Sequence, residues 1–329
     1  MDVSLPAALA EAVAGLSAGR TGLATEARRL SEGYRREQNS ADLVLSDTDA
    51  VAYALSRMPA TYAASLSALT ALATARPDFR PDRLLDLGAG PGTAAWAATA
   101  VWPDVAAITL VERNRRFLDL SAQLAAVAGG ALAQAERLER DLATTGPFTD
   151  PPADLAVLSY ALTELSADVA RRLVVGLIEA GTRHVVIIEP GTPRDHDRLL
   201  DWRRHAIAAG ARPVAPCPHA APCPLATGDW CHFSVRLPRS RQHLRLKGAV
   251  VPFEDEPYAY LVLEGAGAPI VASPARVLRR PQASKHDMNF RLCRADGQLA
   301  EVRIERREAA RWRAVRKLGW GDDFPDAIG

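Results

Sequence analysis

Four cysteines are the residues of this chain whose type and spacing point most directly to chemistry. Three of them, Cys217, Cys223 and Cys231, lie within fifteen residues of one another, and Cys293 lies well downstream. Thiolates are preferred ligands of zinc and of iron–sulfur clusters, and four of them suffice for one complete site. Prolines flank the first two cysteines, and proline favours a rigid, non-helical loop. The sequence therefore predicts one metal or cluster site held by these four side chains.

The spacing of the cysteines leaves the identity of the metal open. The pattern C-x5-C-x7-C with a distant fourth cysteine matches neither the short pairs of zinc ribbons nor the common ferredoxin patterns. His219 and His232 lie beside these cysteines, and either could replace a sulfur in a Cys3His zinc site. Two other interpretations are separately buried cysteines and disulfides, the latter needing an oxidising compartment.

The composition and the charge distribution limit the class of protein. Hydrophobic residues make up 48% of the 329 residues, and no apolar run of about eighteen residues predicts a membrane span. The chain starts with M-D-V-S-L-P, which lacks the basic start of a secretory signal. We therefore expect a monomeric cytoplasmic protein with no membrane partner. Residues 1–190 carry 17 Lys and Arg against 23 Asp and Glu, and residues 191–329 carry 23 against 16, so the second half could bind a polyanion such as nucleic acid.

A glycine-rich turn joins a short apolar strand to an alanine-rich helix. The turn is contained in D-L-G-A-G-P-G, which begins at Asp86 and includes Gly88, Gly90 and Gly92. Glycines let the backbone approach a ligand closely, and the start of the following helix offers free N–H groups. Asp86 would repel a pyrophosphate but suits a ligand that carries a cation or an amine. The segment therefore predicts a ligand site of that kind.

The segments after this turn alternate between strand and helix. Strands are expected at residues 106–111, 135–142, 154–160 and 184–189, with helices between them. This alternation predicts an α/β fold with a doubly wound parallel sheet, whose ligands bind beyond the carboxyl ends of the strands. Glu112 and Asp141 come at two of these ends, where Glu112 can accept hydrogen bonds from both hydroxyls of a ribose.

The turn resembles motif I of the class I S-adenosylmethionine-dependent methyltransferases. The resemblance implies a Rossmann-like, class I methyltransferase-type fold. It also implies that Asp86, Gly88, Gly90 and Gly92 shape the methionine and ribose part of an S-adenosylmethionine site, and that Glu112 binds the ribose diol. Asp141 would then contact the adenine.

Three regions are expected along the chain. Residues 1–80 have the apolar spacing of helices, residues 81–210 form the methyltransferase-like domain, and residues 211–329 form the cysteine loop and a basic, β-rich extension. We expect a hairpin around residues 289–303, turned at Ala295-Asp296-Gly297. The basic tail with Trp312 and Trp320 could serve phosphates and stacked bases, or could be a charged helix docked through its tryptophans.

Seven segments of the chain carry a resemblance to one family. They are R-M-P-A-T-Y-A-A at 57–64, L-D-L-G-A-G-P-G-T at 85–93, I-I-E-P-G-T-P at 187–193, A-P-C-P-H at 215–219, W-C-H-F at 230–233, E-D-E-P-Y-A-Y-L-V-L at 254–263 and R-K-L-G-W-G-D at 316–322. The chain resembles the methyltransferase-like family that acts in assembly of the small ribosomal subunit, the bacterial relatives of mitochondrial methyltransferase-like protein seventeen. The resemblance implies a [4Fe–4S] cluster on Cys217, Cys223, Cys231 and Cys293, which would staple the extension to the sheet, and a ribosomal RNA partner.

The residues for methyl transfer are not evident. The position of the N-P-P-Y tetrapeptide, which amino-group methylation of a base commonly uses, reads Ser159-Tyr160-Ala161-Leu162, and no cysteine remains to act as a nucleophile. Glu164 and Glu189 are candidate bases, or else structural residues. The sequence therefore supports an assembly factor of the small ribosomal subunit first, an active methyltransferase of ribosomal RNA second, and a methyltransferase of a small molecule or a protein third.

Overall fold

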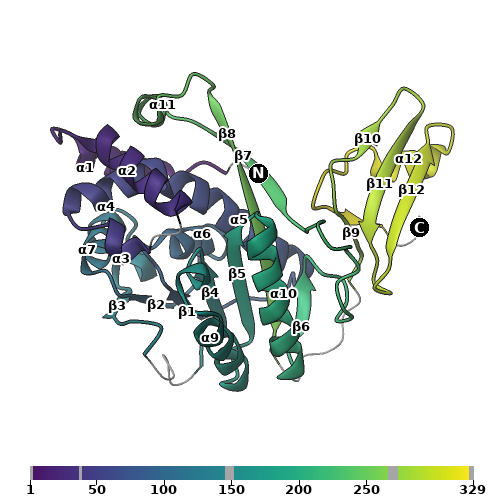
Figure 1. Cartoon of the computed structure of the whole chain (residues 1–329), viewed down its shortest axis with the longest axis horizontal. Helices are drawn as coiled ribbons and strands as arrows, with labels where there is room; N and C mark the ends of the chain where they lie inside the picture. Colours follow the sequence, from purple (N-terminus) through teal and green to yellow (C-terminus); the bar gives the residue numbers. More distant parts are fainter. Residues whose placement is uncertain (1–2, 37–38, 145–151, 266–272, 326–329) are drawn as a thin grey trace.

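Among the described residues, the main sheet has eight strands, five of which run parallel. The computed structural model describes residues 3–36, 39–144, 152–265 and 273–325 (Figure 1). The strand order is β3-β2-β1-β4-β5-β8-β6, with β7 also paired to β8, and β8 runs antiparallel to β5, β6 and β7. The strands are β1 (Arg83–Leu87), β2 (Ala107–Glu112), β3 (Glu136–Glu139), β4 (Leu155–Ser159), β5 (His184–Pro190), β6 (Arg212–Ala215), β7 (Phe233–Pro238) and β8 (Phe253–Glu264).

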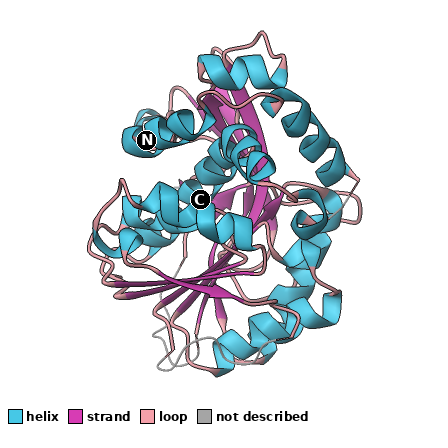
Figure 2. Ribbon diagram, turned by 90° about the vertical axis from the view of Figure 1, so that its left-hand side faces the viewer, coloured by secondary structure: helices cyan, strands magenta, loops and turns pink. Residues whose placement is uncertain are grey.

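Both faces of this sheet are buried, because side chains of alternate residues enter two separate cores. On β5, Val186 and Ile188 face one core, and Val185 and Ile187 face the other. The first core is covered by the helices of residues 7–75 and by α6 (Thr93–Val101) and α7 (Arg115–Ala125), and the second by α9 (Ala167–Glu179) and α10 (Pro193–Ala208). Figure 2 shows helices on both sides of the twisted sheet. The doubly wound, class I methyltransferase-type fold expected from the sequence is confirmed.

The first 80 residues form helices, as their apolar spacing predicts. Ser46 caps α4, because its side chain accepts a hydrogen bond from the Asp49 amide in a capping box. Pro59 lies in the first turn of α5, where proline is tolerated. The helices here are α1 (Ala7–Ser17), α2 (Leu23–Arg35), α3 (Ser40–Leu43), α4 (Asp47–Ser56) and α5 (Met58–Ala75).

The remaining helices of the main body lie between the strands of the main sheet. They are α6 (Thr93–Val101), α7 (Arg115–Ala125), α8 (Gly130–Ala133), the short 3-10 helix η1 (Leu162–Glu164), α9 (Ala167–Glu179), α10 (Pro193–Ala208) and α11 (Arg241–Lys247). The basic run around residues 236–247 is thus partly helical, and α11 packs against α2 and α4. Within the described ranges, no helix combines the length and the apolarity that crossing a bilayer requires.

A second sheet lies to one side of the main body (Figure 1). Its order is β10-β11-β9-β13, with β12 paired to β11. The predicted hairpin is confirmed, because β11 and β12 pair antiparallel with Cys293 opposite Leu299. Its core holds Phe290 and Phe324, whose rings lie 5.2 Å apart. The elements are β9 (Ala275–Val277), β10 (Gln282–Ala283), β11 (Asp287–Cys293), β12 (Leu299–Glu305), α12 (Ala309–Val315) and β13 (Asp323–Phe324).

Strands β6, β7 and β8 come from residues beyond 210, yet they belong to the main sheet. The region predicted as a separate extension therefore contributes both to the first sheet and to the second. The division of the chain into three separate regions, residues 1–80, 81–210 and 211–329, stays a prediction.

A buried ion pair ties the end of α5 to β8. The Arg76 guanidinium contacts both carboxylate oxygens of Glu264 at 2.8 and 3.0 Å, and the side chains are 14% and 9% exposed. Although burial opposes it, the hydrogen bonds and charge of Arg76 hold the pKa of Glu264 below its usual value. The neighbouring His184 does not replace this charge, because burial lowers its pKa to about 4.

Substitution of Arg76 by alanine should lower the free energy of unfolding by about 3 kcal/mol, because it leaves a buried carboxylate without a cation. Urea unfolding at neutral pH measures the change. Arg204, which is 73% exposed and pairs with Asp201, is the control, and Arg204→Ala should cost less than about 0.5 kcal/mol. Equal effects of the two substitutions would contradict the role of the buried pair.

Candidate functional site

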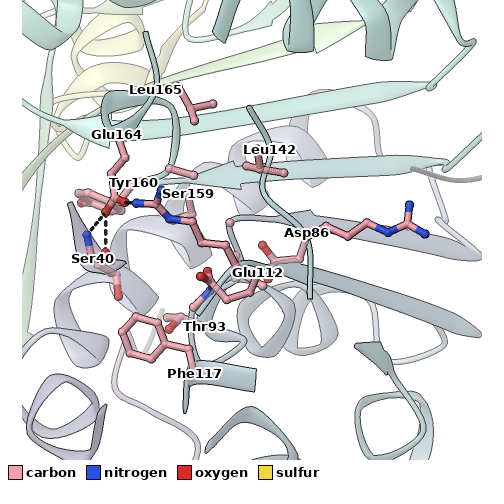
Figure 3. A pocket seen from close by; sticks show the side chains of 18 of the residues that line it. Ser40, Asp86, Thr93, Glu112, Phe117, Leu142, Ser159, Tyr160, Glu164 and Leu165 are labelled. Atoms are coloured by element: carbon pink, nitrogen blue, oxygen red, sulfur yellow. Dashed lines mark hydrogen bonds and ion pairs between the residues drawn. The ribbon is translucent and has the colours of Figure 1, made fainter. Parts of the chain in front are cut away.

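A pocket opens at the carboxyl ends of β1, β2 and β4, with an empty volume of about 740 Å³ that includes space open to solvent. All six residues predicted to bind the cofactor come together here or in the turn beside it. Asp86, Gly88, Gly90, Glu112 and Asp141 line the pocket. Gly92 has a φ of +83° and forms the N-cap of α6 directly below. Figure 3 shows Asp86, Thr93 and Glu112 grouped together, with Ser40 and Glu164 farther along the pocket.

The glycine-rich turn is pressed against its neighbours, which explains why its first residue has no side chain. Gly88 has a φ of +70°, and a Cβ there would lie 2.5 Å from the Cβ of Ala161. Its amide donates to the Val111 carbonyl at 2.8 Å. The Gly90 amide donates to Glu112 at 2.9 Å, so the turn and the acid at the end of β2 hold each other in place.

The Glu112 carboxylate is fixed in orientation at the end of β2. One oxygen accepts from Gly90 and the other from the Asn114 amide at 2.8 Å. Burial raises the pKa of this group, and the two backbone hydrogen bonds oppose that shift. Each carboxylate oxygen accepts more than one hydrogen bond, so this group can also accept from a pair of ligand hydroxyls.

Two buried polar atoms in the pocket lack a partner among the described residues. They are Oδ1 of Asp86 and Oγ1 of Thr93, and both side chains line the cavity. The other Asp86 oxygen accepts from the Ala95 amide at 3.1 Å. Burial raises the pKa of Asp86 to about 7. An unpaired buried polar atom is costly, so this pair of atoms fits a polar ligand with a donor such as an ammonium group.

Residues without any motif complete the pocket. Ser40, Tyr53 and Thr61 come from the N-terminal helices, Phe117 comes from α7, and Tyr160 follows β4. Sequence reasoning missed Ser40, Tyr53 and Phe117, because nothing in their spacing distinguishes them from packing residues. The stretch 57–62 joins α4 to α5 and forms the first turn of α5. Since Thr61 lines the pocket, that stretch contributes to the site.

The two candidate bases have different surroundings. Glu164 lies in the pocket, where it accepts hydrogen bonds from the amide and the hydroxyl of Ser40 and lies 3.5 Å from Arg113. Burial raises the pKa of Glu164. Glu189 is fully buried and accepts from the Leu162 amide at 2.9 Å, and it does not line the described pocket. Glu189 therefore supports η1 rather than facing a ligand.

The four cysteines come together in a second place, beside β6 and the second sheet. Cys217, Cys223, Cys231 and Cys293 all line one cavity. Burial raises the pKa of Cys217, raises that of Cys231 further, and raises that of Cys293 to about 12. Within the part of the chain that the structure describes, no three His, Cys, Asp or Glu side chains stand in a ready metal-binding group. The fold therefore brings four thiols to one cavity, and this arrangement does not determine which metal or cluster they bind.

The two predicted histidine alternatives differ in their position at this cavity. His219 lines it, with its Nε2 3.3 Å from the Cys293 sulfur. His232 instead stacks on Trp230, with ring centroids 4.9 Å apart, and meets Trp320 edge-on. His219 thus remains compatible with a Cys3His zinc site, whereas His232 is used in packing.

Two buried arginine side chains hold the cysteine loop through hydrogen bonds to its backbone carbonyls. Arg203 donates to the carbonyls of His219 and Ala221 at 2.5 and 2.9 Å. Arg276, on β9, donates to the Pro216 carbonyl at 3.2 Å and pairs with Asp323 at 2.7 Å. The loop is therefore bound both to α10 and to the second sheet through protein contacts alone.

Comparison with known proteins identifies the family. Residues 47–325 match the family described as "Rsm22: Mitochondrial small ribosomal subunit Rsm22". The chain belongs to the Rsm22 family. Both candidate sites lie within the matched residues, except for Ser40 at the edge of the cofactor pocket.

Two curated relatives of this Rsm22-family chain are similar in sequence. "Ribosome assembly protein METTL17, mitochondrial" from Homo sapiens is 27% identical over 302 residues, which cover 83% of this chain and 62% of the human protein. "Rsm22-cox11 tandem protein 2, mitochondrial" from Schizosaccharomyces pombe is 24% identical over 356 residues, covering 92% and 46%. The chain thus spans about half to three-fifths of the length of the curated relatives it matches.

Solved structures resemble the chain less closely. Magnesium protoporphyrin IX methyltransferase from Synechocystis PCC 6803 with bound SAM has a TM-score of 0.41 and 12% identity, covering 72% of this chain and 91% of that one. The assignment of the fold rests on the strand order and the two buried faces of the sheet instead.

The Asp86 pKa leads to a prediction about pH. Below about pH 7 the buried carboxyl of the empty protein is neutral, and a cationic ligand favours its charged form. The affinity for S-adenosylmethionine should therefore rise about tenfold between pH 6 and pH 8. Calorimetric titration across this range measures the rise.

Asp86→Asn is the matched control for this prediction. Since the amide does not titrate in this range, the variant should bind more weakly and without the pH dependence. If the wild-type affinity were the same at pH 6 and pH 8, the assignment of Asp86 to a cationic ligand group would be wrong.

Proposed function

We propose that this chain is an assembly factor of the small ribosomal subunit that binds S-adenosylmethionine at the carboxyl edge of its sheet and holds a [4Fe–4S] cluster on four cysteines. The observation that carries the proposal is the meeting of all four cysteines at one cavity, within a chain of the Rsm22 family. The curated human relative is named as a ribosome assembly protein, and this supports the same role here.

The cofactor part of the proposal is supported by the donors and acceptors that the pocket offers. Glu112 would accept hydrogen bonds from the ribose hydroxyls, and Asp86 would face the amino group of the methionine part. At Gly90 a Cβ would meet no atom within 4 Å, so this glycine leaves room for close approach of the ligand to the backbone. Asp141 lines the part of the pocket nearest the end of β3, which suits the proposed contact with the adenine.

The cluster part of the proposal is supported by the chemistry of the donor set. Cys217, Cys223 and Cys231 come from the loop between β6 and β7, and Cys293 ends β11. Four thiolates around one cavity are the usual ligand set of such a cluster. A bound cluster would supply a covalent tie between the two sheets, so that its binding energy stabilises the folded extension. Zinc held by the same thiols is the alternative cofactor.

The ribosomal partner is supported by the positions of the basic residues in the second half. Arg313, Arg316 and Lys317 are exposed on α12 and just after it. Arg311 is partly exposed and pairs with Glu308 at 2.6 Å. Exposed guanidinium groups suit contacts with RNA phosphates. Action in the cytoplasm and a monomeric state stay predictions.

The second candidate function is active methylation of ribosomal RNA. The observation that favours it is another cavity that shares Ser40, Tyr53, Thr61, Tyr160 and Glu164 with the cofactor pocket. An acceptor placed there would be aligned with the activated methyl group, and alignment alone accelerates transfer. A methyltransferase of a small molecule or a protein is the third candidate, and it predicts no binding to the ribosome.

Metal and sulfide analysis tests the cluster directly. Protein purified without oxygen should contain about four iron and four sulfide per chain, with a broad brown absorbance, because four thiolates ligate a [4Fe–4S] cluster. Cys293→Ser should lower both values, and His219→Ala should leave them unchanged. One zinc per chain without sulfide, lost in His219→Ala, would contradict the cluster and identify a Cys3His zinc site.

Co-sedimentation tests the ribosomal partner. A variant with Arg311, Arg313 and Arg316 changed to glutamate should no longer co-sediment with the small subunit at moderate salt, because phosphate contacts are lost and repulsion is introduced. The control changes the exposed Arg28, Arg115 and Arg204 to glutamate and should behave as the wild type. Retained co-sedimentation of the first variant would exclude α12 as the RNA-binding surface.

A further inference from the structure

A second chamber adjoins the cofactor pocket on the side of β4. It encloses about 700 Å³, part of it open to solvent, and it shares Ser40, Tyr160 and Glu164 with the pocket. These three residues lie together in Figure 3, at the end away from Asp86. In the proposed function the ribose lies at Glu112 and the amino acid near Asp86, so the methyl group would face the end of β4 and this chamber.

The wall between the two spaces is a strained residue. Tyr160 has a φ of +57°, and it is the one described residue other than glycine with a positive φ. A bulky residue in this conformation costs about 1–3 kcal/mol and persists where its surroundings hold it, often at a functional site. Here its amide donates to the Ile188 carbonyl at 2.7 Å, and its hydroxyl donates to Glu256 at 3.1 Å.

The contacts of Tyr160 join segments that lie far apart in the sequence. Glu256 belongs to β8, and the charge of Arg57, at the start of α5, opposes the effect that burial has on the Glu256 pKa. Arg57 also lies under the ring of Tyr34, 5.7 Å from its centroid. Three segments that are distant in the sequence therefore fix the orientation of the Tyr160 ring between the cofactor pocket and the chamber.

The chamber combines aromatic rings with arginine side chains. Tyr34, Tyr53 and Tyr160 line it, together with the amide side chain of Asn39. Arg194 and Arg198, one turn apart on α10, also line it, and both pair with the buried Asp195. Two guanidinium groups thus lie at one wall of the chamber. Glu164, which also lines the chamber, accepts a hydrogen bond from Ser40 and lies beside Arg113.

We propose that this chamber binds a nucleotide, with its base against Tyr160 and its phosphate at Arg194 and Arg198. The inference rests on the proposed function, since it takes the methyl group of the cofactor to face the chamber. Tyrosine rings and guanidinium planes stack on bases, Asn39 can hydrogen-bond a base edge, and arginine is the preferred side chain for a phosphate. A neutral acceptor would make no use of the arginines, and a bare anion would make no use of the three rings.

Calorimetric titration of nucleotides tests the proposal. The full chain, purified without oxygen and saturated with S-adenosylhomocysteine, is titrated with AMP, GMP, CMP and UMP, and with the four nucleosides. At least one monophosphate should bind with a Kd below about 1 mM and at least tenfold more tightly than its nucleoside. Binding of none of the four, or equal affinity of nucleotide and nucleoside, would overturn the proposal.

Two variants on the same helix assign the phosphate contact. Arg198→Ala should lower the affinity for the monophosphate at least tenfold, since Asp195 keeps its ion pair with Arg194 and the helix stays intact. Arg204→Ala, a substitution of an exposed arginine just under two turns farther along α10, should have no effect. An equal loss in both variants, or in neither, would contradict the assignment.

The same titration shows whether the nucleotide is free or part of an RNA strand. It also shows which of the two proposals a negative result contradicts. Binding of a dinucleoside monophosphate, which carries an internal phosphodiester, identifies a nucleotide within an RNA strand. Binding of free monophosphates alone identifies a free nucleotide. Failure to bind S-adenosylhomocysteine contradicts the proposed function itself, whereas its binding without any nucleotide contradicts only the acceptor chamber.

Discussion

The antiparallel pairing of β5 with β8 is the contact on which both candidate sites depend. Seven residue pairs fix its register, from His184 opposite Glu264 to Pro190 opposite Tyr258. In this register Glu256 reaches Tyr160 beside the cofactor pocket, and Tyr260 lines the cavity of the cysteines. A shift of one residue would turn every side chain of β8 to the opposite face of the sheet. One strand register thus positions residues at two sites with different chemistry.

The turn after β5 adds further contacts to β8 and to the cysteine loop. The Gly191 amide donates to the Pro257 carbonyl at 3.1 Å, and its carbonyl accepts from the indole of Trp230 at 3.0 Å. A Cβ at Gly191 would lie 2.8 Å from the Tyr258 nitrogen, so the two backbones approach more closely than any side chain allows. Trp230 precedes Cys231, and the cysteine loop is therefore anchored to the edge of the sheet that carries the pocket.

Much of the fold and part of the site could be predicted because the signals are local. The turn from Asp86 to Gly92 has glycines where φ is positive and an acid on the strand before them, and four cysteines in a cysteine-poor chain point to one cavity. The insertion of β8 between β5 and β6 could not be predicted, because antiparallel pairing between distant segments leaves no periodic pattern. Ser40 and Tyr53 were missed for a related reason, since tertiary packing alone brings them to the pocket.

The position of β8 in the sheet has a consequence for synthesis of the chain. The strands β1 to β5 are complete once residue 190 has been made, and their order places β5 at an edge until residues 253–264 follow. During that interval β5, which reads H-V-V-I-I-E-P, presents unpaired backbone groups on an apolar strand. Exposed edges of this kind pair readily with other chains. The nascent protein is therefore most exposed to aggregation while the ribosome translates the cysteine loop and β7.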